Sequence, residues 1–257
     1  MSVTPARTRN YRQIYESSEL LWEKLGMLSP AQRRSFDERF IMSWIYHDFA
    51  LEGTVLSVAE IKAAIDDEII STPSLIPAYF HIMAVRDAIQ FLLDSRGSRL
   101  QLSLEWLKKI HMILLPQGKK DQVQYRKDNP IHRMYFHDLS PADKISYRMR
   151  KLTDWFRTEE CRKAHPIELA VEVHRELIRI FPWPDISGRV ARMAMNAILI
   201  GESYWPSIIH AIDRQTYYDV LRLDQDQLLN LVVDGMEEGI RSSSRLYQSI
   251  VDASRGG

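Results

Sequence analysis

Cysteine and long apolar runs are nearly absent from this chain. Cys161 is the single cysteine among 257 residues. An internal disulfide is therefore excluded, and a reducing compartment is expected. No apolar run approaches the ~20 residues of a membrane-spanning helix, and Met1 to Asn10 lacks the apolar core of a secretory leader. By elimination, we expect a cytoplasmic protein that does not enter a membrane.

An excess of one charge is missing as well. The chain has 34 Lys and Arg residues against 34 Asp and Glu residues. This balance offers no electrostatic basis for binding nucleic acid or an anionic membrane. The sequence shows no repeat, low-complexity tract or clear linker.

Glycine is also sparse, with 10 residues, and apolar residues recur mostly with a helical period. The pattern predicts an all-α fold. Capping signals at Ser29-Pro30 and at Ser57 with Glu60 mark two helix starts. The expected helices cover 11–25, 30 towards a break at 51–53, 58 onward, 77–92, 102 or 103 through 114, 141 through Trp155, 167–180, 187 onward, 213–221 and 227–250, and Asp213 is expected to cap the helix at 213–221. The charged stretch 118–136 predicts a loop and a hairpin.

The most informative stretch is 181–192, which reads FPWPDISGRVAR. A helix that is apolar on one face ends before Pro182 and Pro184, and Ser187-Gly188 begins the next helix. A helix start offers free N–H groups and a positive dipole end, which stabilise an anion. Arg189 and Arg192 are spaced to share one face of that helix and to bind phosphate.

These residues resemble the Fic motif, H-P-F-x-[DE]-G-N-G-R-x-x-R, of the Fido-fold proteins. The best-known members transfer AMP from ATP to protein hydroxyl groups. The matching positions are Pro182, Asp185, Gly188, Arg189 and Arg192. The departures are Phe181 for the motif His, Trp183 for Phe, Ile186 for the first Gly and Ser187 for Asn.

The resemblance extends over about residues 40–225. It implies an all-α Fido bundle with a short β-hairpin flap that holds a target peptide. The flap would begin after Tyr125-Arg126 and include Ile131, His132, Arg133, Met134 and Tyr135. Glu52-Gly53 resembles the family's inhibitory motif, [ST]-x-x-x-E-[GN], although Asp48 stands where Ser or Thr belongs. We expect an N-terminal helical extension at 1–38, a Fic-like domain at 39–225 and a C-terminal helix at 226–257 on the same domain.

Phe181 changes the chemistry that the resemblance implies. The family's His removes a proton from the target hydroxyl, and imidazole suits this because its pKa is about 6.5. A phenyl ring has no lone pair, and loss of a general base usually costs ~10²–10⁴-fold in rate. Ile186 adds a branched side chain to the phosphate loop, and the hydroxyl of Ser187 is shorter than an Asn side chain.

Several site residues have two interpretations. By resemblance, Asp185 would hold Mg²⁺ together with a nucleotide; alternatively, it caps the helix that follows. Arg189 and Arg192 bind phosphate, together with Ser187 and Gly188, or the arginines form ion pairs, with Glu52 the expected partner of Arg192. We consider His137, at the end of the flap, as a replacement base.

Three hypotheses for function follow. The first is a Fic-like protein that does not perform ordinary AMP transfer but keeps part of a pocket for a nucleotide or another phosphate-containing small molecule. The second is a divergent transferase or lyase that acts on a phosphate-containing substrate without the His base. The third is a non-catalytic scaffold or regulatory partner. A protein or peptide target at the flap and a homodimer are compatible with all three.

Overall fold

The computed structural model describes residues 10–65, 76–116, 124–128, 139–222 and 225–254, and these residues form helices and connecting turns without a strand. The all-α prediction is confirmed. The hairpin flap, including residues 131–135 and His137, was predicted in a part of the chain outside the described residues. The helices are α1 (Tyr11–Gly26), α2 (Pro30–Leu51), α3 (Val58–Ile65), α4 (Ile76–Leu93), α5 (Leu104–Leu114), α6 (Ile145–Phe156), α7 (Glu159–Lys163), α8 (Pro166–Ile180), α9 (Ser187–Gly201), α10 (Arg214–Val220) and α11 (Gln225–Ala253), with the short 3₁₀ turns η3 (Ala142–Lys144) and η4 (Ala211–Asp213).

Helix starts follow the local capping chemistry that the sequence predicts. The Ser29 hydroxyl accepts from the Gln32 amide, and the Gln32 side chain accepts from the Ser29 amide. Ser57 and Glu60 make the same reciprocal pair. Each pair satisfies two N–H groups that the first helical turn leaves without a partner. These starts could be predicted because the interacting residues lie three positions apart.

The start of α10 departs from the prediction. Asp213 was expected to cap this helix with its side chain, but it makes no side-chain cap hydrogen bond. Instead, the Asp213 amide donates to the carbonyl of His210 at 2.9 Å, which closes the 3₁₀ turn η4. Because this turn leads directly into α10, the backbone takes over the role that we assigned to the carboxylate.

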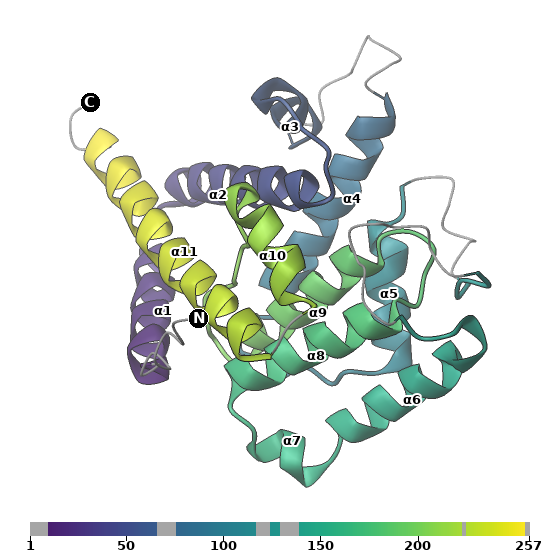
Figure 1. Ribbon diagram of the computed structural model, residues 1–257. Helices are drawn as coiled ribbons and strands as arrows, with labels where there is room; N and C mark the ends of the chain where they lie inside the picture. Colours follow the sequence, from purple (N-terminus) through teal and green to yellow (C-terminus); the bar gives the residue numbers. More distant parts are fainter. Residues whose placement is uncertain (1–9, 66–75, 117–123, 129–138, 223–224, 255–257) are drawn as a thin grey trace, which may run out of the picture.

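Helices α8 and α9 lie side by side in the middle of the molecule, with α6 and α7 beyond α8 (Figure 1). All residues of α9 are buried, so this helix is enclosed on every side. Its polar Asn196 exchanges two hydrogen bonds with the backbone of Ser207, at 2.8 and 3.0 Å. A polar side chain in such a core is tolerated because its amide is paired.

The N-terminal helices pack onto the same core. The rings of Trp22 on α1 and Trp205 lie 4.3 Å apart, and the Trp22 indole donates to the Ser203 carbonyl. Helix α11 contacts α1, α2 and α8 (Figure 1). Helix α2 continues without a break through residues 38 and 39, where we expect a domain boundary. Within the described parts of the chain, no helix is both long and apolar enough to cross a bilayer.

Gly201 allows a close approach that another residue would prevent. A Cβ atom there would lie 2.8 Å from the Ser98 carbonyl oxygen, whereas a Cβ at Gly26, the last residue of α1, would meet nothing within 4 Å. We predict that Gly201→Ala lowers the free energy of unfolding by about 1–3 kcal/mol because backbone must shift. Gly26→Ala should raise it by about 0.4–1 kcal/mol through the unfolded state. Urea denaturation of both variants tests this, and equal effects would contradict it.

Candidate functional site

The loop between α8 and α9 bends through two residues with left-handed backbone conformation. Phe181 has φ 46° and ends α8, donating its amide to the Leu177 carbonyl at 2.8 Å. Ile186, directly before α9, has φ 56°. A β-branched residue in this region is strained, at about 1–2 kcal/mol. The Fic motif has glycine at the position of Ile186, which removes that strain.

Ser187 closes this loop on itself. Its hydroxyl accepts from the Trp183 amide and donates to the Trp183 carbonyl, both at 2.8 Å, and the residue is buried. The hydroxyl group that we considered as a hydrogen-bond donor to phosphate is therefore engaged inside the loop. Asp185 is exposed and does not cap α9 with its side chain. Among the described residues its carboxylate has no hydrogen-bond or ion-pair partner, so the capping interpretation loses its support.

Arg126 holds the loop in place through hydrogen bonds to backbone carbonyl groups. Its guanidinium donates to the Phe181 carbonyl at 2.7 Å, to the Ile180 carbonyl at 3.3 Å and to the Ser140 carbonyl. Its amide donates to the Pro182 carbonyl at 2.9 Å. A buried cation thus meets the carbonyl groups that the end of α8 leaves unpaired. By resemblance, Arg126 belongs to the start of the flap, and its hydrogen bonds to the α8–α9 loop cannot be read from the sequence.

An aromatic pair supports the same loop. The fully buried ring of Trp183 stacks on His111 of α5, with ring centroids 4.3 Å apart and 12° between the planes. Burial lowers the pKa of His111 to about 4, so its ring is neutral near pH 7. His111 therefore serves as an apolar surface for Trp183.

Arg189 and Arg192 are buried on α9 and face two carboxylates of α2. The Asp48 carboxylate accepts from Nε of Arg189 and, at 2.9 Å, from Nε of Arg192. Glu52 accepts from Nη2 of Arg192 at 2.7 Å. The guanidinium of Arg189 also lies 4.5 Å from the ring centroid of Phe49. We call Asp48 and Glu52 the carboxylate clamp.

Asp48 is ionised in this setting. Burial alone would raise the pKa of its carboxyl group, but the charges and hydrogen bonds of Arg192 and Arg189 outweigh burial and lower it below the usual range. Since two guanidinium groups meet two carboxylates, the clamp is electrically balanced. The predicted pairing of Glu52 with Arg192 is confirmed. The larger contribution of Asp48 was missed, although its spacing of four from Glu52 places both residues on one helix face.

The end of α2 that carries the clamp is held in place by α10 and the turn before it. The Leu51 carbonyl accepts from Arg214 Nε at 2.9 Å and from the Tyr218 hydroxyl at 2.8 Å. His47 Nδ1 accepts from the Ala211 amide at 3.1 Å. A helix leaves its last carbonyl groups unpaired, so these bonds fix the clamp in position without using its carboxylates.

The histidines offer no base in the described part of the site. His174 is fully buried and lies 3.0 Å from the Tyr217 hydroxyl through Nε2. Burial, and secondarily the charge of Arg192, lowers its pKa to about 3. His132 and His137 lie outside the described residues. Among the described residues, no three His, Cys, Asp or Glu side chains gather as a metal site.

The motif loop and α9 lie in a segment that is similar to known proteins. A model described as the Fic/DOC family matches residues 101–199. The chain is 26% identical over 228 residues to "Protein adenylyltransferase Fic" of Drosophila mojavensis, and 24% identical over 224 residues to "Protein adenylyltransferase fic-1" of Caenorhabditis elegans. These alignments cover 84% and 86% of this chain but 44% of each relative. The chain thus spans less than half the length of these curated relatives.

Solved structures show the same fold. A Fic-1 fragment from C. elegans superposes with a TM-score of 0.72 at 21% identity, over 95% of this chain and 73% of that one. A Fic domain containing signaling protein from Bacteroides thetaiotaomicron gives 0.68 at 21% identity, over 95% of both chains. At these identities the likeness concerns the fold alone.

The clamp predicts unequal costs for its two carboxylates. Asp48→Ala removes a carboxylate that compensates two buried guanidinium groups, and we expect it to lower the free energy of unfolding by about 3–5 kcal/mol. Glu52 is 24% exposed, so Glu52→Ala should cost about 1 kcal/mol. Urea denaturation measures both. Glu238→Ala, which breaks an ion pair with exposed Arg245, is the control. A loss for Asp48→Ala no larger than the control's would contradict the clamp.

Proposed function

Because the chain belongs to the Fic/DOC family, we propose that it is a binding protein of this family whose phosphate site is occupied by its own carboxylates. In this proposal the site takes a phosphate-containing small molecule, such as a nucleotide, only when Asp48 and Glu52 leave the arginines. The chain does not transfer AMP by the family's His-base mechanism. The observation that carries the proposal is the double engagement of Arg189 and Arg192 by the clamp.

The charges explain why binding and the clamp exclude each other. Two guanidinium groups at the start of a helix attract an anion strongly when they are free. Here each already has a carboxylate partner, and Asp48 is almost fully buried. A phosphate group has to replace these carboxylates at the same donors. The affinity is therefore reduced by the free energy of opening the clamp.

The remaining donors fit a phosphate once the clamp is open. The first turn of α9, at Gly188 and Arg189, has N–H groups that the helix itself does not use. The exposed carboxylate of Asp185 lies on the same loop. With the phosphate oxygens of a nucleotide it would hold Mg²⁺, which is commonly bound by one or two carboxylates plus phosphate.

Phe181 carries the catalytic half of the proposal. Phe181 is 3% exposed at the end of α8, and its phenyl ring has no lone pair with which to accept a proton. His174 does not stand in for it, because a pKa of about 3 makes its ring a weak base and its Nε2 is engaged by the Tyr217 hydroxyl. The curated relatives are adenylyltransferases by name; this chain has Phe181 at the position where the Fic motif has the His that general-base transfer uses. The single, buried Cys161 supports a reducing compartment such as the cytoplasm.

Nucleotide binding should appear when the clamp is neutralised. Asp48→Asn/Glu52→Gln removes both negative charges with little change of shape. We predict that Mg-ATP, at about 100-fold its Kd for this double variant, raises the Tm of the variant by about 5 °C or more. The same concentration should raise the Tm of the wild type by about 1 °C or less. Thermal unfolding and titration calorimetry measure the two effects.

A matched triple variant tests the role of the arginine. Adding Arg189→Gln to the double variant should abolish the rise in Tm, because it removes a guanidinium group that would donate hydrogen bonds to the phosphate. Pyrophosphate in place of ATP separates recognition of phosphate from recognition of the nucleoside. If the double variant responds to neither ATP, AMP nor pyrophosphate, nucleotide binding is wrong, and a scaffold function without a ligand takes its place.

Restoring the base alone should not restore transfer. We predict that Phe181→His incorporates label from α-labelled ATP less than about tenfold faster than Phe181→Gln. A general base can raise a rate by ~10²–10⁴-fold, but the clamp and the closed loop still occupy the phosphate site. Phe181→His combined with Asp48→Asn/Glu52→Gln should label more strongly. Strong labelling by Phe181→His alone would show that the clamp does not block the site. Brisk labelling by the wild type would favour a divergent transferase.

A further inference from the structure

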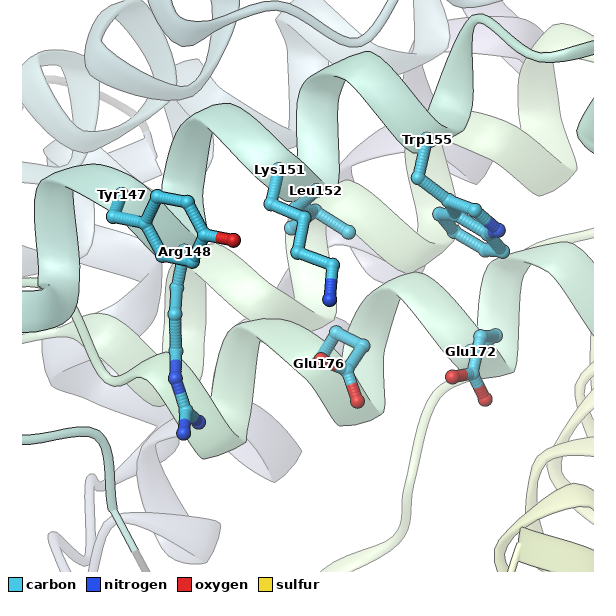
Figure 2. Close-up of a pocket in the computed structure, with 7 residues that line it drawn as sticks. All are labelled: Tyr147, Arg148, Lys151, Leu152, Trp155, Glu172 and Glu176. Atoms are coloured by element: carbon cyan, nitrogen blue, oxygen red, sulfur yellow. The ribbon is translucent and has the colours of Figure 1, made fainter.

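A groove of about 480 Å³ lies on the outer surface between α6 and α8, away from the clamp. Figure 2 shows Lys151 and Trp155 of α6 facing Glu176 and Glu172 of α8 across this groove. A second hollow of about 540 Å³ on the other side of α6 shares Tyr147, Lys151 and Trp155. These three residues are four positions apart and therefore form one ridge along α6.

Most of the charges without an ion pair on this surface are positive, and the exposed Asp154 of α6 is the exception. Glu172 is paired with Arg175 at 2.8 Å, and Glu176 with Arg179 at 3.3 Å, so both acids of the α8 wall are compensated within their own helix. The basic side chains of α6 have no such partner. Four basic side chains are exposed and form no ion pair within the described ranges. They are Arg148, Arg150 and Lys151 on α6 and Arg157 directly after it.

Apolar and aromatic surface is available beside these cations. Tyr147 is 60% exposed, Trp155 is partly exposed, and the buried Leu152 forms the floor between them. Tyr and Trp are enriched at protein interfaces because one rigid side chain offers both apolar area and a hydrogen bond. Cations placed around such a floor suit a ligand that carries carboxylates next to an apolar side chain.

The combination favours a peptide over a nucleic acid. The cations that line the groove, Arg148 and Lys151, lie on α6 alone, a local pair that suits a few peptide carboxylates better than a continuous phosphate backbone. The chain as a whole has no net charge, so it lacks the broad positive field that nonspecific nucleic-acid binding uses. The groove also leads towards the α8–α9 loop, since the Ser140 amide before α6 donates to the Arg179 carbonyl near the end of α8.

We propose that the α6–α8 groove docks an acidic peptide segment of a partner protein, with a Leu or aromatic side chain over Leu152 and Trp155 and carboxylates at Arg148 and Lys151. This docking goes beyond nucleotide binding and does not depend on it, because none of these residues contacts the clamp. It would bring a protein segment to the surface next to the motif loop.

Direct binding to a synthetic peptide tests the proposal. The probe is a short fluorescein-labelled peptide in which Glu residues flank a central Leu-Trp pair, measured by fluorescence anisotropy on the full chain. Arg148→Glu/Lys151→Glu should weaken binding at least about tenfold, and added salt should weaken the wild type towards that value. Both residues are exposed, so the fold should remain intact, as circular dichroism can verify.

Matched controls separate this groove from general charge effects. Arg34→Glu/Arg39→Glu makes the same charge change at exposed positions of α2, and its affinity should stay within about twofold of the wild type. Trp155→Ala should weaken binding about tenfold or more, with Trp155→Phe retaining most of it.

Four results would overturn the proposal. The first two are binding of the counterpart peptide, with Lys in place of Glu, as tight as that of the Glu peptide, and binding of a labelled oligothymidine as tight or tighter. The third is an equal loss of affinity in the two charge-reversed variants. The fourth is absence of binding at millimolar peptide. The oligothymidine result would assign the surface to nucleic acid instead. None of these measurements involves ATP, so their outcome is independent of the outcome for the clamp.

Discussion

The pairing of Arg189 and Arg192 with Asp48 and Glu52 is the interaction on which the rest of the molecule depends. Two guanidinium groups are buried on a central helix, and an uncompensated buried charge is too costly to persist. The nearest compensation comes from α2, more than 140 positions earlier in the chain for Asp48. This requirement ties the N-terminal helices to the motif helix. The polar bonds at Leu51 and His47 then hold α2 in the register that the ion pairs need.

The same logic runs through the loop between α8 and α9. Its polar groups are satisfied within the chain: Ser187 by the Trp183 backbone, and the last carbonyl groups of α8 by Arg126. Groups that would meet a phosphate in a binding loop are here used to stabilise the loop. In the proposed function, a ligand would exchange existing interactions for new ones, and its net affinity would be the difference between the two sets.

Asp48 illustrates what could and could not be predicted about the site. The sequence places it four residues before Glu52, on the same helix face, and in the position where the resemblance has Ser or Thr. That spacing indicated a shared surface, but it did not indicate a partner. The partner depends on how α2 crosses α9, which no periodicity reports. Arg126 and the stack of His111 on Trp183 escaped prediction for the same reason.

The sequence by itself determined the helices, their capped starts at Ser29 and Ser57, and the presence of Phe181 where the motif has His. These properties are local: a capping pair or an apolar period involves residues within a few positions of each other. The tertiary structure decided which charges meet, that the arginines face carboxylates, and where a groove opens between α6 and α8. Such contacts join residues far apart in the chain, and their geometry depends on the packing of whole helices.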